Sequence, residues 1–149
     1  MKRFTVTAAL LLALALPARA GELASVQSPS GVTLQASLVQ GDRLQIAILP
    51  GEAIRLNGRL GVAFDASDGA PVWAGNLPRL VLGQGDYFTE PVLETIHLDP
   101  AALEGASQAA VTFGACLPVT GICVLEEVAL TLSRGTDGKL DLDLAMLEP

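Results

Sequence analysis

Hydrophobic and polar residues alternate with a period of two along most of the chain after residue 30. Side chains that alternate in this way lie on opposite faces of a β-strand, with one face buried and the other in water. Residues that favour turns, mainly Pro, Gly, Asp and Ser, separate the alternating runs. The pattern therefore predicts strands over residues 32–39, 43–49, 61–65, 92–98, 109–115, 128–132 and 139–144.

Six to eight short strands separated by turns are typical of an all-β fold, and we expect an immunoglobulin-like antiparallel β-sandwich. One short helical turn is predicted over residues 99–105, with Asp99 as the N-cap, Pro100 at the first helical position and Gly105 at the exit. No internal repeat or linker divides the chain. Residues 21–149 are expected to form a single domain.

The first twenty residues have the composition of a signal peptide. Lys2 and Arg3 precede an apolar run over residues 8–16, and the small-residue pattern Ala18-Arg19-Ala20 follows. We expect cleavage before Gly21 and export to the periplasm. The apolar run is shorter than the ~20 residues that cross a bilayer, so stable membrane insertion is not expected.

The net charge of the chain argues against some classes of binding partner. The chain has 16 acidic and 9 basic residues, and three of the basic ones, Lys2, Arg3 and Arg19, belong to the presequence. The mature surface is therefore strongly acidic and would repel phosphate groups. Nucleic acid is not an expected partner.

Cys116 and Cys123 are the two cysteines of the chain. In an oxidising compartment a close pair of this kind is expected to form a disulfide for at least part of its life. Alternation from Ala109 to Ala115 places Cys116 on the face opposite the apolar set, and Cys123 is placed in the same way. We expect both sulfurs on the more polar side of one hairpin, whose strands are joined by residues 117–122.

Two interpretations of this pair remain open. A disulfide closing an eight-residue loop contributes roughly 2.5 kcal/mol in the chain-entropy model, which suits a structural clip in a non-catalytic binding module. However, the clip would tie strands that the hairpin already holds together. An accessible disulfide at a sheet end would instead suit thiol–disulfide exchange with a partner thiolate, which needs no cofactor.

The stretch from Gly85 to Leu132 resembles the N-terminal periplasmic domain of the thiol:disulfide interchange protein DsbD and its relatives. The resemblance lies in an aromatic-containing loop, two strands and the cysteine spacing. The residues that carry it are Gly85-Asp-Tyr-Phe-Thr-Glu-Pro, the alternating run Val92 to Leu98, Ala109-Ala-Val-Thr-Phe-Gly-Ala-Cys116, Ile122-Cys123 and Val128-Ala-Leu-Thr-Leu132.

This resemblance implies an immunoglobulin-like relay of reducing equivalents. The donor would be a thioredoxin-like domain or a membrane electron carrier, and the acceptor a periplasmic disulfide isomerase or a thioredoxin-like protein of cytochrome c maturation. It implies Cys123 as the nucleophile, Cys116 as the resolving thiol, and Tyr87 or Phe88 as the lid of a cap loop that shields the disulfide. The family's best-known members continue into further domains, so the donor is expected to be a separate protein.

Carboxylates near a thiol disfavour its thiolate and slow its attack. Asp86 and Glu90 near the expected lid, and Glu126 and Glu127 beside Cys123, are candidate modulators, although a solvated pair is the simpler interpretation of Glu126-Glu127.

The remaining residues with recognisable chemistry are interpreted as structural. His97 is the single histidine and is expected to be an ordinary surface or half-buried residue, and Trp73 is expected to anchor the core. No cluster of His and Cys has metal-ligand spacing, so neither a metal nor a cofactor is expected.

Overall fold

A computed structural model describes residues 23–66 and 68–148 of the chain. The predicted signal peptide, residues 1–20, and its cleavage before Gly21 lie outside the described residues. Within the described ranges, no helix is long and apolar enough to cross a membrane.

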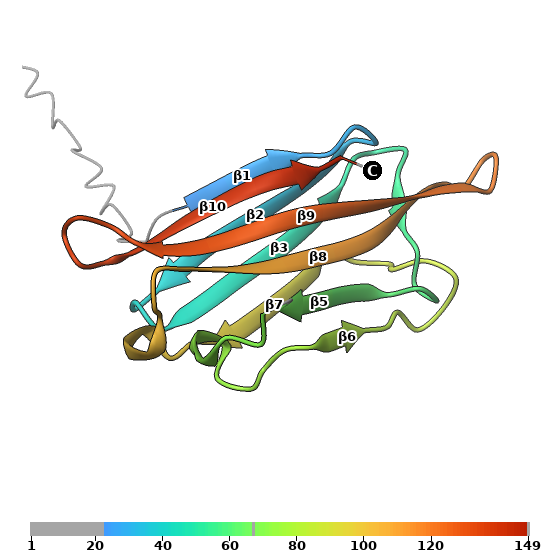
Figure 1. Ribbon diagram of the computed structural model, residues 1–149. Coiled ribbons are helices and arrows are strands. Elements are labelled where there is room, and N and C mark those ends of the chain that lie inside the picture. Colours follow the sequence, from blue (N-terminus) through green and yellow to red (C-terminus); the bar gives the residue numbers. More distant parts are fainter. Residues whose placement is uncertain (1–22, 67, 149) are drawn as a thin grey trace, which may run out of the picture.

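Two antiparallel sheets pack face to face across a continuous apolar core (Figure 1). The predicted all-β sandwich is confirmed, whereas its immunoglobulin-like assignment stays a prediction. The first sheet has the order β1 (Leu23–Gln27), β2 (Val32–Val39), β3 (Arg43–Pro50) and β7 (Val92–His97). The second has the order β10 (Leu140–Leu147), β9 (Ile122–Arg134), β8 (Ala106–Leu117), β5 (Val62–Ala66) and β6 (Arg79–Val81), and β4 (Arg55–Leu56) also pairs with β8.

Alternate residues of the long strands form the core, as the period of two predicts. On β8 the buried apolar residues Ala109, Val111, Phe113 and Ala115 share the face that alternation assigns to the core. Each of the seven predicted strands is present, although β8 and β9 extend well beyond the expected bounds. The connection between them is accordingly four residues long rather than six, because Leu117 pairs with Ile122.

Trp73 confirms its expected role as a core anchor. It ends the short 3-10 helix η1 (Pro71–Trp73), is 2% exposed, and its indole Nε1–H donates to Ser107 Oγ at 2.8 Å. The pairing satisfies a polar group that burial would otherwise leave without a partner.

The helical turn expected after residue 99 is a single 3-10 turn, η2 (Pro100–Ala102). Pro100 occupies its first position as predicted. Asp99 occupies the N-cap position as predicted, but its side chain makes no capping hydrogen bond, and backbone bonds from Ala102 and Leu103 close the turn. The turn ends at Leu103 rather than at Gly105.

Candidate functional site

The end of the β8–β9 hairpin carries the two cysteines and projects beyond the neighbouring strands (Figure 1). The strands remain paired up to Leu117 and Ile122, where a four-residue turn joins them. Leu117 O accepts hydrogen bonds from Thr120 N at 3.2 Å and Gly121 N at 2.8 Å. Gly121 has a φ of 71°, a conformation that glycine adopts without steric cost, so the turn closes tightly.

Cys116 and Cys123 lie directly opposite each other in this ladder and form a disulfide. Their Cα atoms are 4.0 Å apart. Opposed side chains of an antiparallel pair project from the same face of the sheet, which brings the two sulfurs together. The predicted pairing and the predicted common face are therefore both confirmed.

The two cysteines differ in exposure, which corrects the expectation that both lie open on a polar face. Cys116 is 0% exposed, whereas Cys123 is exposed. The strand β8 has neighbours on both edges at this point, Arg55 of β4 and Cys123 itself. Within the described part of the chain, β10 pairs with β9 only from Glu127 onward, so the outer edge of β9 beside Cys123 is unpaired.

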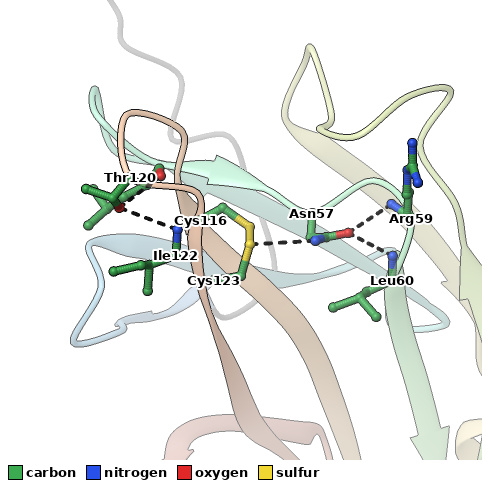
Figure 2. Close-up of a disulfide and its surroundings, with 8 residues drawn as sticks. Asn57, Arg59, Leu60, Cys116, Thr120, Ile122 and Cys123 are labelled. Atoms are coloured by element: carbon green, nitrogen blue, oxygen red, sulfur yellow. Dashed lines mark hydrogen bonds between the residues drawn. A yellow bond between two sulfur atoms is a disulfide. The ribbon is translucent and has the colours of Figure 1, made fainter.

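Asn57 contacts the sulfur of Cys123. It lies where the chain leaves the edge of β8 after β4, and its backbone N–H donates to Gly114 O at 2.9 Å. Its side-chain Oδ1 accepts from Arg59 N at 3.0 Å and from Leu60 N at 2.9 Å, and its Nδ2 donates to Cys123 Sγ at 3.7 Å (Figure 2).

Gly114 makes the approach of Asn57 possible. A Cβ at Gly114 would lie 3.0 Å from Asn57 Cβ, closer than such contacts normally allow. Gly114 is on the same face of β8 as Cys116, so its missing side chain leaves room beside the disulfide. Sequence reasoning missed Asn57, although the Asn57-Gly58 dipeptide is a strong turn signal.

Tyr87 and Phe88, the two expected lid residues, run alongside β4 rather than beside the cysteines. Tyr87 forms an isolated antiparallel bridge with Asn57, and Phe88 N donates to Leu56 O at 2.9 Å. Phe88 also packs against the core. Of the two, Tyr87 is therefore the aromatic side chain that is free of a core role.

A groove of about 610 Å³ connects this loop with the disulfide hairpin. Arg55, which pairs with Cys116 in the ladder, lines this groove, and its guanidinium Nη1 donates to the carbonyl oxygens of Glu52 and Ile54. The groove is lined by Arg55, residues 85–89 and Pro118.

The candidate modulating carboxylates do not gather around the sulfurs. Asp86 forms an exposed ion pair with Arg59 at 2.5 Å, so its charge is balanced locally. Glu90 is exposed and lines an adjoining groove of about 490 Å³ between β6 and β7. Glu127 is exposed on the Cys123 face, four residues further along β9.

Glu126 is not part of a solvated pair, and this interpretation is wrong for it. Glu126 is 7% exposed. It lies on the core face of β9, opposite Phe113 of β8. Its Oε1 accepts hydrogen bonds from Ser30 Oγ and Ser30 N, which lie in the turn between β1 and β2. The side chain therefore points away from the face that carries Cys123.

Exposed apolar side chains lie on both faces of the hairpin end that carries Cys123. We call this set the apolar tip, and its most exposed member, Val119, is 98% exposed. Isolated exposed apolar residues are common on protein surfaces, but a contiguous group usually marks a contact site. The apolar tip consists of Leu117, Val119, Ile122, Val124 and Leu125.

Neither His97 nor a metal cluster contributes to this site. His97 is exposed on β7, as expected for an ordinary surface histidine, and it pairs with Arg43 of β3. Among residues 23–66 and 68–148, no three His, Cys, Asp or Glu side chains lie close enough together to hold a metal ion.

Comparison of the chain with models of protein families, with curated proteins and with solved structures finds no match.

Proposed function

We propose that this protein is an exported thiol–disulfide exchange module that works through the Cys116–Cys123 pair. The observation that carries the proposal is the position of Cys123, an exposed residue near the end of a projecting hairpin whose two faces carry exposed apolar side chains. A sulfur must be reachable along the disulfide axis before a thiolate can attack it, and a protein partner needs an apolar surface next to it.

The difference in exposure between Cys116 and Cys123 supports different roles for the two residues. A partner thiolate attacks Cys123 Sγ, a mixed disulfide forms, and Cys116 Sγ leaves as a thiolate that takes a proton. The partner's second thiol then attacks the mixed disulfide and releases Cys123. The partner dithiol is oxidised to a disulfide, and the Cys116–Cys123 disulfide is reduced to two thiols. The reverse sequence passes the same two electrons to an acceptor.

The fold has little need of this disulfide, which supports an exchange role over a structural one. The strands β8 and β9 pair without a break from Ala106–Ser133 to Leu117–Ile122. A clip at the end of this ladder ties residues that the backbone hydrogen bonds already hold. Structural disulfides gain most where they join distant segments.

The same proposal gives the protein its partners and compartment. In the periplasm, the donor is a thioredoxin-like domain or a membrane electron carrier. The acceptor is a thioredoxin-like protein such as a disulfide isomerase or a cytochrome c maturation factor. In this scheme Tyr87 is the lid: it lines the groove that leads to Pro118 of the disulfide hairpin, and a change in its position would gate access.

The proposal is tested with the two single-cysteine variants and a purified thioredoxin. Reduced Cys116→Ser, which keeps the exposed Cys123, should form a stable mixed disulfide with a thioredoxin that lacks its resolving cysteine and carries thionitrobenzoate on the remaining one, and thionitrobenzoate leaves as the thiolate. Cys123→Ser, which keeps the buried Cys116, should do so at least tenfold more slowly, because thiol exchange requires access to the sulfur. The proposal is contradicted if the two variants form the mixed disulfide at equal rates, or if neither forms it.

One observation favours a second function, that of a binding module with a structural disulfide. Cys116 is 0% exposed, as inert structural cysteines commonly are. In that case the apolar tip still docks a protein, but the disulfide stays intact. The two functions differ in whether the oxidised protein consumes reducing equivalents from reduced thioredoxin.

A further inference from the structure

The orientation of the Asn57 side chain is fixed by the backbone around it. Its Oδ1 accepts two backbone N–H groups, from Arg59 and Leu60. An amide nitrogen carries hydrogens and cannot accept these bonds, so the oxygen must face the two donors. The Nδ2 group is thereby directed at Cys123 Sγ, 3.7 Å away (Figure 2).

The anchors of Asn57 do not involve the disulfide. Its backbone N–H is bonded to Gly114 O, and Gly58 N is bonded to Asp86 O at 2.8 Å. Gly114 supplies the space that Asn57 occupies. None of these contacts requires the disulfide, so we expect the donor to stay beside Cys123 when that residue becomes a free thiol.

We propose that Asn57 makes Cys123 the attacking thiolate of the reduced pair, by donating its Nδ2–H hydrogen bond to the sulfur. Hydrogen bonds to a charged acceptor are stronger than those to a neutral one, so the contact favours the thiolate over the thiol. Cys116 differs from Cys123 in being 0% exposed, and burial in apolar surroundings disfavours a thiolate. The biological use of this asymmetry rests on the proposed function, whereas its physical basis does not.

The step that Asn57 promotes is the transfer of electrons to a partner disulfide. The Cys123 thiolate attacks one sulfur of that disulfide, and the partner's other sulfur leaves as a thiolate. Cys116 then loses its proton to solvent and attacks Cys123 Sγ, which restores the Cys116–Cys123 bond and releases the second partner thiolate. The pair is oxidised by two electrons, and the partner disulfide is reduced by the same two.

The test compares two proteins that both carry Cys116→Ser, so that Cys123 is the single thiol. One keeps Asn57 and the other carries Asn57→Asp. Asn57→Asp keeps an oxygen for the Arg59 and Leu60 amides and so preserves the turn, but it replaces the donor at the sulfur with a carboxylate oxygen. The readout is the rate of alkylation by iodoacetamide as a function of pH. This reaction requires the thiolate but no partner protein.

At neutral pH, the Asn57→Asp rate should fall about threefold or more, because a roughly tenfold loss of thiolate is partly offset by higher intrinsic nucleophilicity. The rise of the rate with pH should also move to higher pH. Asn57→Ala should show the same direction. A fall of less than about twofold in Asn57→Asp, with no displacement of the pH profile, overturns the proposal.

Two controls separate an effect at the sulfur from a change in the fold. Thr120→Ala alters the turn on the other side of the disulfide, where Thr120 Oγ1 is bonded to Leu117 O and Ile122 N, and should leave the alkylation rate unchanged. In concentrated urea all variants should react alike. The alkylation rate could fall in Asn57→Asp as expected while thioredoxin fails to reduce the disulfide of the unmodified protein. That pair of results would reject the proposed function and retain this inference.

Discussion

Glu126 of β9 accepts two hydrogen bonds from Ser30, one from the hydroxyl at 2.7 Å and one from the backbone N–H at 3.2 Å. The two residues are 96 positions apart in the sequence. Glu126 Oε2 has no hydrogen-bond partner among the described residues, so Ser30 alone compensates this buried carboxylate. The contact ties the turn between β1 and β2 to the strand that carries Cys123.

Ser30→Ala is expected to destabilise the protein by about 1.5 kcal/mol, because it removes a hydrogen bond to a charged and buried acceptor. The exposed Ser25 of β1 provides a matched control, and Ser25→Ala should change stability by less than about 0.5 kcal/mol. Urea unfolding followed by circular dichroism measures both. Equal midpoints for the two variants would mean that the Ser30–Glu126 contact contributes nothing.

Reduction of the disulfide should leave the sandwich folded. The loss of stability should be no more than about 2.5 kcal/mol, the chain-entropy value for a loop of this size. Circular dichroism and urea unfolding with and without a strong dithiol reductant provide the measurement. Unfolding on reduction at room temperature would show that the bond is structural, since a relay must tolerate both states.

The apolar tip should matter for a protein partner but not for a small reductant. Val119→Lys is expected to slow reduction by thioredoxin about fivefold, or about 1 kcal/mol, because it places a charge in the contact surface. Its reduction by dithiothreitol should be unchanged. Leu93 of β7 is 70% exposed on the other sheet, so Leu93→Lys is the matched control. If Val119→Lys and Leu93→Lys change the rate of reduction by thioredoxin equally, the apolar tip is not the contact surface.

Tyr87 and Phe88 should separate a gating role from a packing role. Tyr87→Ala is expected to speed reduction by glutathione, because its ring lines the groove that leads to Pro118. Phe88→Ala should instead cost about 2 kcal/mol of folding stability, since its ring packs against the core. Glutathione kinetics and urea unfolding check the two effects. Unchanged kinetics in Tyr87→Ala would remove Tyr87 as the lid.

The sequence predicted the long strands and the disulfide because both follow from local patterns. Alternation of apolar residues is visible within eight residues, and two cysteines close in sequence leave one pairing. The strands β4 and β6 were missed because two and three residues are too few to show a period. The edge strand β1 was missed as well, since its burial is only partial along its length.

The surroundings of the disulfide could not be predicted, because they depend on long-range pairing. Cys116 was expected to be open, and its burial accompanies pairing with Arg55, 61 positions earlier, which no local pattern indicates. Glu126 was expected in solvent, yet it occupies a core-facing register position and is satisfied by Ser30. Asn57 reaches Cys123 across 66 positions, because Gly114 leaves room for it.

The reduction potential of the Cys116–Cys123 pair tests the central claim most directly. Equilibration with a glutathione or thioredoxin redox buffer, followed by alkylation and mass spectrometry, measures it. Exchange activity predicts a value between roughly −180 and −270 mV, the range of known shuttling pairs. A value well below about −300 mV would identify the bond as a stable structural disulfide and contradict the account.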